Sequence, residues 1–208
     1  VKIPQREIVE NKPKLSLDHF FLGRAWLMAL NILFFGLCWG IMSNYVAIYG
    51  QERLGITDGT GIFFMLLSAG LMVSRIFGTK ALRDGKLTEN CARGVLISLA
   101  GYTMFALGIG PIGYYGAALL IGLGNGQMYP AFLSMFINVA RHDQRGTANS
   151  SILISWDLGM GIGILLGGFL VQYMSYDAAF WATAIMQGTG AVLFLTLTRN
   201  FFLRRRLQ

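Results

Sequence analysis

One acidic residue lies in the middle of a long apolar segment. Asp157 falls within the run from Arg141 to Met174, which begins with a basic turn and carries no other charge after Arg145. If this segment crosses a bilayer, Asp157 lies about twelve residues past Arg145, or roughly 18 Å deep at about 1.5 Å per residue. A carboxylate near the midplane costs roughly 3 kcal/mol or more unless it is paired, protonated or facing water. We therefore expect Asp157 either to exchange a proton or to bond a neighbouring helix.

Two other apolar runs carry polar side chains at mid-depth. In the first, Asn31, Phe35, Cys38, Met42 and Tyr45 share one helical face, which meets either a cavity or neighbouring helices. In the second, Gly122, Gly124, Gly126 and Pro130 predict a softened or kinked helix around Asn125. The residues that we expect to contact a ligand are Asn31, Trp39, Tyr45, Asn125, Gln127 and Tyr129.

Small residues in the Asp157 segment predict close helix packing on another face. Gly159, Gly163 and Gly167 form two overlapping GxxxG spacings. This spacing lets the backbones of two membrane helices approach closely. The same helix is therefore expected to pack through its glycines and to present Asp157 on another side.

The composition indicates an all-α integral membrane protein, because 54% of the residues are hydrophobic and only 13% are charged. Uncharged runs near the length needed to cross the hydrocarbon predict six transmembrane helices in one six-helix bundle. Their approximate ranges are 25–48, 60–79, 94–110, 112–138, 147–173 and 178–198. The bundle is expected over residues 21–198, preceded by a linker at 1–20 and followed by a basic tail at 199–208.

The positive charges gather on one side of this predicted topology. With six spans, both termini share a side with the turns near 80–93 and 139–147, whereas the opposite side holds only Arg53. The shared side carries Lys2, Arg6, Lys12, Lys14, Arg24, Lys80, Arg83, Lys86, Arg93, Arg141, Arg145, Arg199, Arg204, Arg205 and Arg206, while Arg75 lies inside the second span. The positive-inside rule then predicts cytoplasmic termini, and the net charge of +7 reflects topology and anionic lipid rather than nucleic acid.

Signals for soluble enzyme chemistry are missing from the sequence. There is no CxxC or HxxxH pair, no phosphate-binding loop and no GxSxG motif. Cys38 lies within a span and Cys91 in a turn on the basic side, so a disulfide between them is not expected. We predict a protein that is not an enzyme and that needs neither a cofactor nor a metal.

The pattern RGxANSSxxxxWDLGxGIGxxLGG in the fifth predicted span resembles the C-terminal half of major facilitator superfamily permeases, most closely the drug and sugar efflux group. The turn after the second span is similar to the family's cytoplasmic motif at Gly78, Arg83, Gly85 and Lys86, although Leu82 stands where the motif has its acid. The resemblance begins partway through the family's pattern, and the chain starts with Val1. We therefore expect the second half of a longer permease, residues 1–20 being the end of its central loop.

The resemblance implies a mechanism and a set of partners. Two six-helix bundles, each a pair of inverted three-helix repeats, would rock about a midplane site lined by the first and fourth spans and, more peripherally, by the second and fifth. Asp157 would couple transport to H+, and the substrate would be a small organic molecule exported across the plasma (inner) membrane. The partner bundle is an N-terminal half in the same chain or a second copy in a homodimer. A membrane scaffold without transport activity is the remaining alternative.

Overall fold

The computed structural model describes residues 21–57 and 59–207, and every regular element in these ranges is helical. The expected linker at 1–20 lies outside the described residues. The main helices are α1 (Trp26–Leu54), α2 (Gly59–Arg83), α3 (Leu87–Ala106), α4 (Gly110–Val139), α5 (Arg145–Tyr173), α6 (Tyr176–Leu193) and α7 (Arg199–Arg205). A π-helical segment, Phe194–Thr198, joins α6 to α7, so the helix expected to end at 198 continues to Arg205.

Four helical stretches in the described part of the chain are long and apolar enough to cross a membrane. They are Gly23–Leu54, Gly59–Ile76, His142–Tyr173 and Tyr176–Arg205. The helices α3 and α4 have 20 and 30 residues but fall outside this set. The described part of the chain is thus all-helical, with several helices that suit a multi-pass membrane protein, and the count of six crossings stays a prediction.

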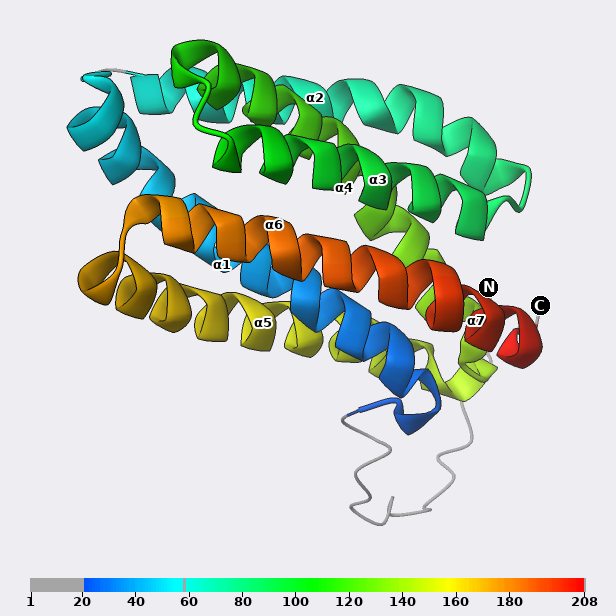
Figure 1. Ribbon diagram of the computed structural model, residues 1–208. Coiled ribbons are helices and arrows are strands. Elements are labelled where there is room, and N and C mark those ends of the chain that lie inside the picture. Colours follow the sequence, from blue (N-terminus) through cyan, green and yellow to red (C-terminus); the bar gives the residue numbers. More distant parts are fainter. Residues whose placement is uncertain (1–20, 58, 208) are drawn as a thin grey trace, which may run out of the picture.

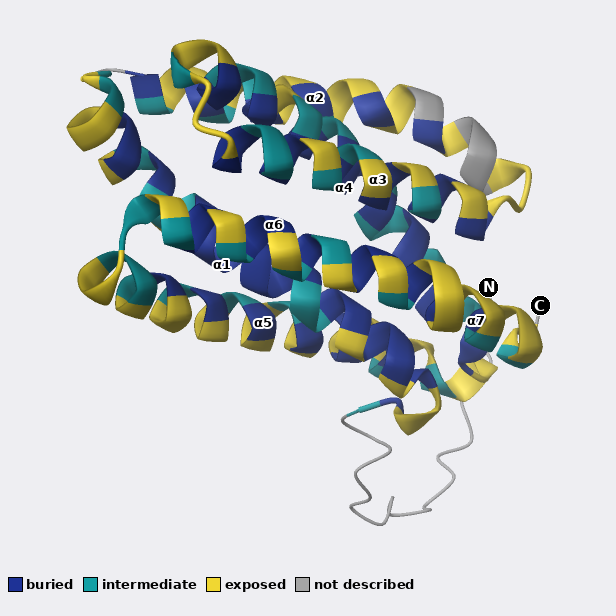
Figure 2. Ribbon diagram, in the orientation of Figure 1, coloured by how far each residue is buried: buried dark blue, intermediate teal, exposed yellow. Residues whose placement is uncertain are grey.

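The helices form two groups with their axes along a common direction. Figure 1 shows α2, α3 and α4 together on one side and α1, α5 and α6 on the other. The most extensive packing is between α3 and α4, between α1 and α5, and between α2 and α4, while α6 packs on both α1 and α3. In α1, 72% of the residues of its apolar stretch are buried, whereas in α2 and in α5 the buried share is only 28%. Figure 2 accordingly shows α1 largely buried and the outer faces of α2 and α5 exposed.

The α1–α5 crossing is built on glycine from both helices. A Cβ added at Gly40 of α1 would lie 2.2 Å from the Met160 carbonyl oxygen of α5. On α5, the nearest atoms to an added Cβ are the Leu33 carbonyl oxygen at Gly159 (2.2 Å), the Leu37 carbonyl oxygen at Gly163 (2.3 Å) and the Tyr45 ring at Gly167 (2.6 Å). At Gly40, Gly159 and Gly163 the nearest atom is a backbone carbonyl oxygen, so no other residue type fits unless the two helices separate, which is how small residues fix helix contact in membranes.

The helix α4 runs without interruption through its glycines and Pro130, and a softening or kink at mid-depth stays a prediction. A Cβ added at Gly122 would lie 2.1 Å from the Leu67 carbonyl oxygen of α2, and one at Gly126 would meet the Ser74 hydroxyl of the same helix. Gly124 instead faces α3, where an added Cβ would lie 2.4 Å from the Ser98 nitrogen. These glycines let α2 and α3 pack closely on two sides of α4, and that packing stabilises the helix despite their low propensity.

Candidate functional site

A pocket of about 380 Å³ lies where α1, α2, α4 and α5 come together. Its lining combines aromatic, apolar and polar side chains from all four helices. They are Trp39, Leu71, Arg75, Asn125, Gly126, Tyr129, Pro130, Leu153 and Trp156. Arg75 and Leu153 are exposed, so the pocket is open on the side where they lie.

Three aromatic rings form one wall of the pocket. Trp156 of α5 lies at the centre, with its ring centroid 6.4 Å from that of Trp39 and 5.5 Å from that of Tyr129. The Tyr129 and Trp156 rings meet edge to face, at an interplanar angle of 81°. Such a wall offers a large apolar surface to a flat ligand, with hydroxyl and indole groups that can also hydrogen-bond.

Two polar side chains of the lining differ in how they are held. Asn125 is only 8% exposed, and its Oδ1 accepts a hydrogen bond of 3.0 Å from the Ser98 hydroxyl of α3. The Arg75 side chain is exposed and has no hydrogen-bond or ion-pair partner among the described residues. A second pocket of about 360 Å³ shares Arg75, Gly126, Tyr129 and Pro130 with the first and extends toward Asn90. Arg75 therefore lines both pockets, and its guanidinium can bind a ligand in either of them.

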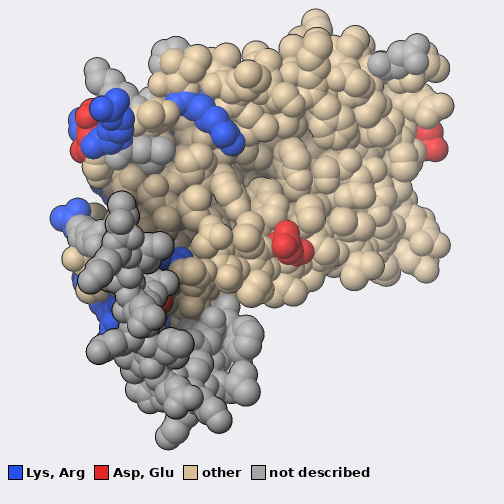
Figure 3. Space-filling view, turned by 180° about the vertical axis from the view of Figure 1, so that it is seen from behind, with Lys and Arg blue, Asp and Glu red and all other residues tan. Residues whose placement is uncertain are grey.

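Asp157 lies at the edge of the pocket. It is exposed, and it follows the lining residue Leu153 by one helical turn on the same side of α5. Asp157 is also the one acid among the described residues that lies more than a few positions from a helix end. Figure 3 shows an acidic group isolated on a broad uncharged surface, while Lys and Arg gather at one end of the molecule.

Three of the residues predicted to contact a ligand lie outside this pocket. Asn31 is fully buried against α6, where its Nδ2 donates to the Gly190 carbonyl oxygen (2.9 Å) and its Oδ1 accepts from the Thr198 hydroxyl. The Tyr45 hydroxyl donates to the Ile164 carbonyl oxygen of α5 (3.0 Å). Gln127 lies on the side of α4 that faces α2 and α3, near Gly78 and Gly94. The structure thus gathers Trp39, Asn125 and Tyr129 and separates them from the other three.

The turn after α2 has a backbone that its glycine makes possible. Gly85 has a φ of 73°, a left-handed conformation that residues with a side chain rarely adopt. Arg83 ends α2, and Lys86 directly precedes α3. Gly78 is buried within α2, and a Cβ added there would lie 3.6 Å from the Asn90 amide nitrogen.

Arg75 lines the pocket, although its place in the sequence did not predict a role in ligand binding. Its position inside the second apolar run was visible, but a cation near the basic end of a span is usually an interfacial anchor. The feature that distinguishes Arg75 is its distance from the turn, since it lies eight positions before Arg83 at the end of α2. Arg75 is the last residue but one of the apolar stretch Gly59–Ile76, and an ionisable side chain there that also lines a pocket is a candidate functional group.

The sequence matches a family model almost from end to end. The model described as Major Facilitator Superfamily matches residues 2–159 and again residues 85–205. The chain belongs to the major facilitator superfamily. Among curated proteins, it is 33% identical over 95 residues to a probable efflux pump, mfs2, of Aspergillus flavus, covering 44% of this chain and 22% of that one. It is 29% identical over 140 residues to the multidrug resistance protein MdtH of Yersinia enterocolitica, covering 67% of this chain and 29% of that protein.

The fold of this superfamily member also matches a solved transporter. A crystal structure of the peptide transporter POT in complex with alafosfalin superposes with a TM-score of 0.75 at 17% identity, over 88% of this chain and 40% of that chain. The family match confirms the expected resemblance to major facilitator permeases, and the relatives and the fold are those of transporters of this superfamily rather than of enzymes. The matched regions span less than a third of the curated relatives' own length.

Proposed function

We propose that this chain is the C-terminal six-helix half of a secondary transporter that exports small organic molecules, and that the pocket between α1, α2, α4 and α5 is its share of the substrate site. The observation that carries the proposal is the meeting of the aromatic wall with Arg75 and Asn125 inside an otherwise apolar bundle. Ligand pockets typically combine a large apolar surface with a few convergent polar groups. Export is supported by the relatives named as an efflux pump and a multidrug resistance protein.

A second bundle would close the open side of the pocket. The outward faces of α2 and α5 flank the pocket and carry large exposed apolar side chains, among them Met72, Ile76 and Leu158. The chain covers only 40% of the peptide transporter, so a second bundle would account for most of the remaining length of such a protein. That bundle is an N-terminal half of the same protein or, as the alternative, a second copy of this chain.

The packing pattern supports two inverted three-helix repeats within the bundle. Two such repeats would make α1 correspond to α4, α2 to α5 and α3 to α6. The α1–α5 pair would then correspond to the α4–α2 pair. Both pairs are among the most extensive contacts, and both are closed by glycine against carbonyl oxygens of the partner helix. Repeats of this kind place the substrate near the bilayer midplane in secondary transporters, and alternating access follows from rocking one bundle against the other.

Asp157 supplies the proton coupling in this proposal. While the second bundle covers it, an ionised carboxylate in apolar surroundings is unfavourable, so the group binds a proton. When the bundles separate, water reaches Asp157 and the proton can leave. The two conformations then differ in proton affinity, which is the requirement for a gradient to drive the change. The basic end of the bundle would face the cytoplasm of the plasma (inner) membrane, giving an antiporter that exchanges H+ for its substrate.

The test is export by cells that express the native gene product containing this chain. Two flat fluorescent probes of opposite charge, ethidium and carboxyfluorescein, sample the chemistry that the aromatic wall and Arg75 can accept. Trp156→Ala removes the centre of the wall and should reduce export of the accepted probe at least tenfold, since aromatic pocket contacts contribute roughly 1.5 kcal/mol or more. Trp181→Ala, an exposed tryptophan of α6 away from the pocket, is the matched control. Equal export by both variants would remove the pocket from the transport path.

A further inference from the structure

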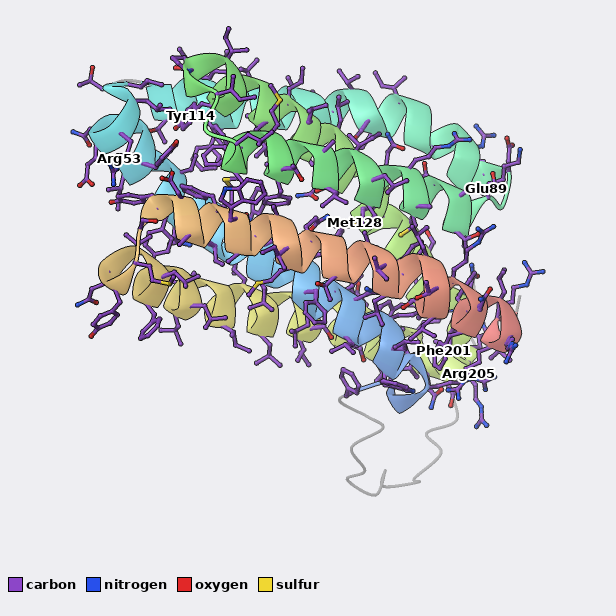
Figure 4. The ribbon with its side chains drawn as sticks, in the orientation of Figure 1. Arg53, Glu89, Tyr114, Met128, Phe201 and Arg205 are labelled. Atoms are coloured by element: carbon purple, nitrogen blue, oxygen red, sulfur yellow. The ribbon has the colours of Figure 1, made fainter. Side chains whose placement is uncertain are left out.

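A groove at the basic end of the bundle lies between the start of α1 and the end of the α6–α7 helix. Its volume is about 510 Å³, and its lining is a mixture of aromatic, polar and cationic side chains. They are Trp26, Leu27, Thr196, Leu197, Asn200, Phe201, Arg204 and Arg205. Figure 4 shows Phe201 and Arg205 together at this end, beside the first turn of α1. The groove shares no lining residue with the pocket of the proposed transport site.

One wall of the groove is an ordered stack of rings and guanidinium. The Phe201 ring meets Trp26 edge to face, with 6.0 Å between centroids, and carries the Arg205 guanidinium carbon 4.2 Å from its centroid on another side. Arg205 Nη1 also donates to the Arg24 carbonyl oxygen (3.2 Å), and Arg24 Nη2 donates to the Arg205 carbonyl oxygen (3.4 Å). These contacts connect the segment directly before α1 to the end of α7, so the wall is already ordered before a ligand binds.

Arg204 is the group in the groove that is left for a ligand. It is exposed, and no described residue bonds its guanidinium. Next to it, the Asn200 amide nitrogen donates to the Thr196 carbonyl oxygen (3.1 Å), which fixes that side chain along the helix. The exposed apolar surface begins directly beside these polar groups, since Trp26 is 52% exposed and Leu197 is 56% exposed.

We propose that this groove binds the headgroup of an anionic phospholipid. The Arg204 guanidinium would bond the phosphate through two parallel N–H donors, as arginine does with phosphate oxygens. The acyl chains would run along Leu197 and the apolar side of Trp26 into the hydrocarbon. A tail that only anchors the helix electrostatically requires charge but no groove with an ordered aromatic wall. A soluble anion would use the charge but would leave the exposed Leu197 and Trp26 uncovered. The combination of a free cation with exposed apolar surface at a helix end fits a lipid.

The test counts lipids bound to the purified full chain in a nonionic detergent by native mass spectrometry. The chain is titrated with phosphatidylglycerol or with phosphatidylcholine of the same acyl chains. One phosphatidylglycerol should bind well before the first phosphatidylcholine. Arg204→Gln should weaken that first binding about tenfold, the size expected for a charge-assisted bidentate contact near a membrane surface. Arg199→Gln is the control, because it removes the same charge from an exposed position on α7 that does not line the groove.

Three results would overturn the lipid site. Equal binding of the two lipids would show that the headgroup charge is not recognised. Equal weakening by Arg204→Gln and Arg199→Gln would show a diffuse electrostatic attraction instead of a site. Displacement of phosphatidylglycerol by millimolar inorganic phosphate would assign the groove to a soluble anion. If Arg204→Gln disturbs folding, Arg204→Lys keeps a positive charge and removes the two parallel N–H donors, and it should weaken the first phosphatidylglycerol more than Arg199→Lys does.

Discussion

Two glycines of α5, separated by one residue, should respond in opposite ways to the same substitution. A Cβ at Gly163 would lie 2.3 Å from the Leu37 carbonyl oxygen, about 1 Å inside ordinary van der Waals contact, which begins at 3.4 Å. A Cβ at Gly161 would have nothing within 4 Å. Gly163→Ala must therefore push α1 and α5 apart, whereas Gly161→Ala only replaces a weak helix former by a strong one.

The magnitude follows from two terms. Overpacking a close contact against backbone costs about 1–3 kcal/mol, and the alanine at position 161 gains about 0.5–1 kcal/mol from helix propensity. An alanine at position 163 gains the same propensity term, so it cancels, and the two variants should differ by the overpacking cost of about 1–3 kcal/mol, which corresponds to about 2–12 °C in Tm for a chain of this size. Thermal unfolding of the purified chain in detergent, followed by circular dichroism, measures this difference directly.

The comparison is internally controlled, because both variants add one methyl group to the same helix. Equal Tm values would refute the reasoning, since they would show that α1 and α5 do not approach at Gly163 as closely as the structure has them. A lower Tm for Gly161→Ala would refute it as well, because that position would then have to be packed. Only destabilisation confined to Gly163→Ala agrees with a crossing fixed by glycine.

Three further substitutions test separate parts of the site. Asp157→Asn should abolish the dependence of export on an imposed pH gradient and should leave binding of the probe to the purified protein within about threefold. The reason is that the amide keeps the shape of the side chain and loses only the proton exchange. Unchanged gradient-driven export would exclude Asp157 from coupling. Arg75→Gln should reduce export of an anionic probe about tenfold or more, because it removes the cation that contacts the substrate. Arg83→Gln, at the end of the same helix, should not reduce this export. Similar export by the two variants would show that Arg75 only anchors the helix at the membrane surface. Asn31→Leu should lower the free energy of unfolding by about 1–2 kcal/mol and should not change the substrate preference. Both polar atoms of the Asn31 side chain form hydrogen bonds, one with Gly190 of α6 and one with Thr198 of the π-helical segment. An altered substrate preference would show that Asn31 takes part in transport.

Much of the architecture follows from the apolar pattern of the sequence. Long uncharged runs have few alternatives to a membrane helix, so α1, α2, α5 and α6 coincide with predicted spans to within a few residues at most ends. The close approach at Gly163 also follows from sequence, because a GxxxG spacing on one face has a direct steric meaning. Where a local pattern has a single physical consequence, the sequence is sufficient to predict it.

The remaining assignments depend on which neighbour a helix face meets. Periodicity showed that Asn31 and Tyr45 share a side of α1, but a face that packs on α6 or α5 has the same spacing as one that lines a cavity. The glycines of α4 have low helix propensity in isolation, and only their tertiary contacts with α2 and α3 show that they are packing residues. Arg75 was ambiguous for the same reason, since its depth is readable from sequence but its place between two hollows is not.

The position of the pocket bears on how the bundle can move. Trp39 and Trp156 come from the α1–α5 pair, whereas Arg75 and Tyr129 come from the α2–α4 pair, so the pocket lies at the boundary between the two pairs. Within each pair, glycines lie against carbonyl oxygens, and little movement is possible without losing that fit. Across the boundary, the contact at the pocket is between side chains, with the Tyr129 ring on Trp156, and a side chain can change rotamer at low cost. We therefore expect a bound substrate to change the distance between the pairs and to leave each crossing unchanged. Spin labels on the exposed faces of α2 and α5 should report that change, and a label pair on α1 and α5 should not.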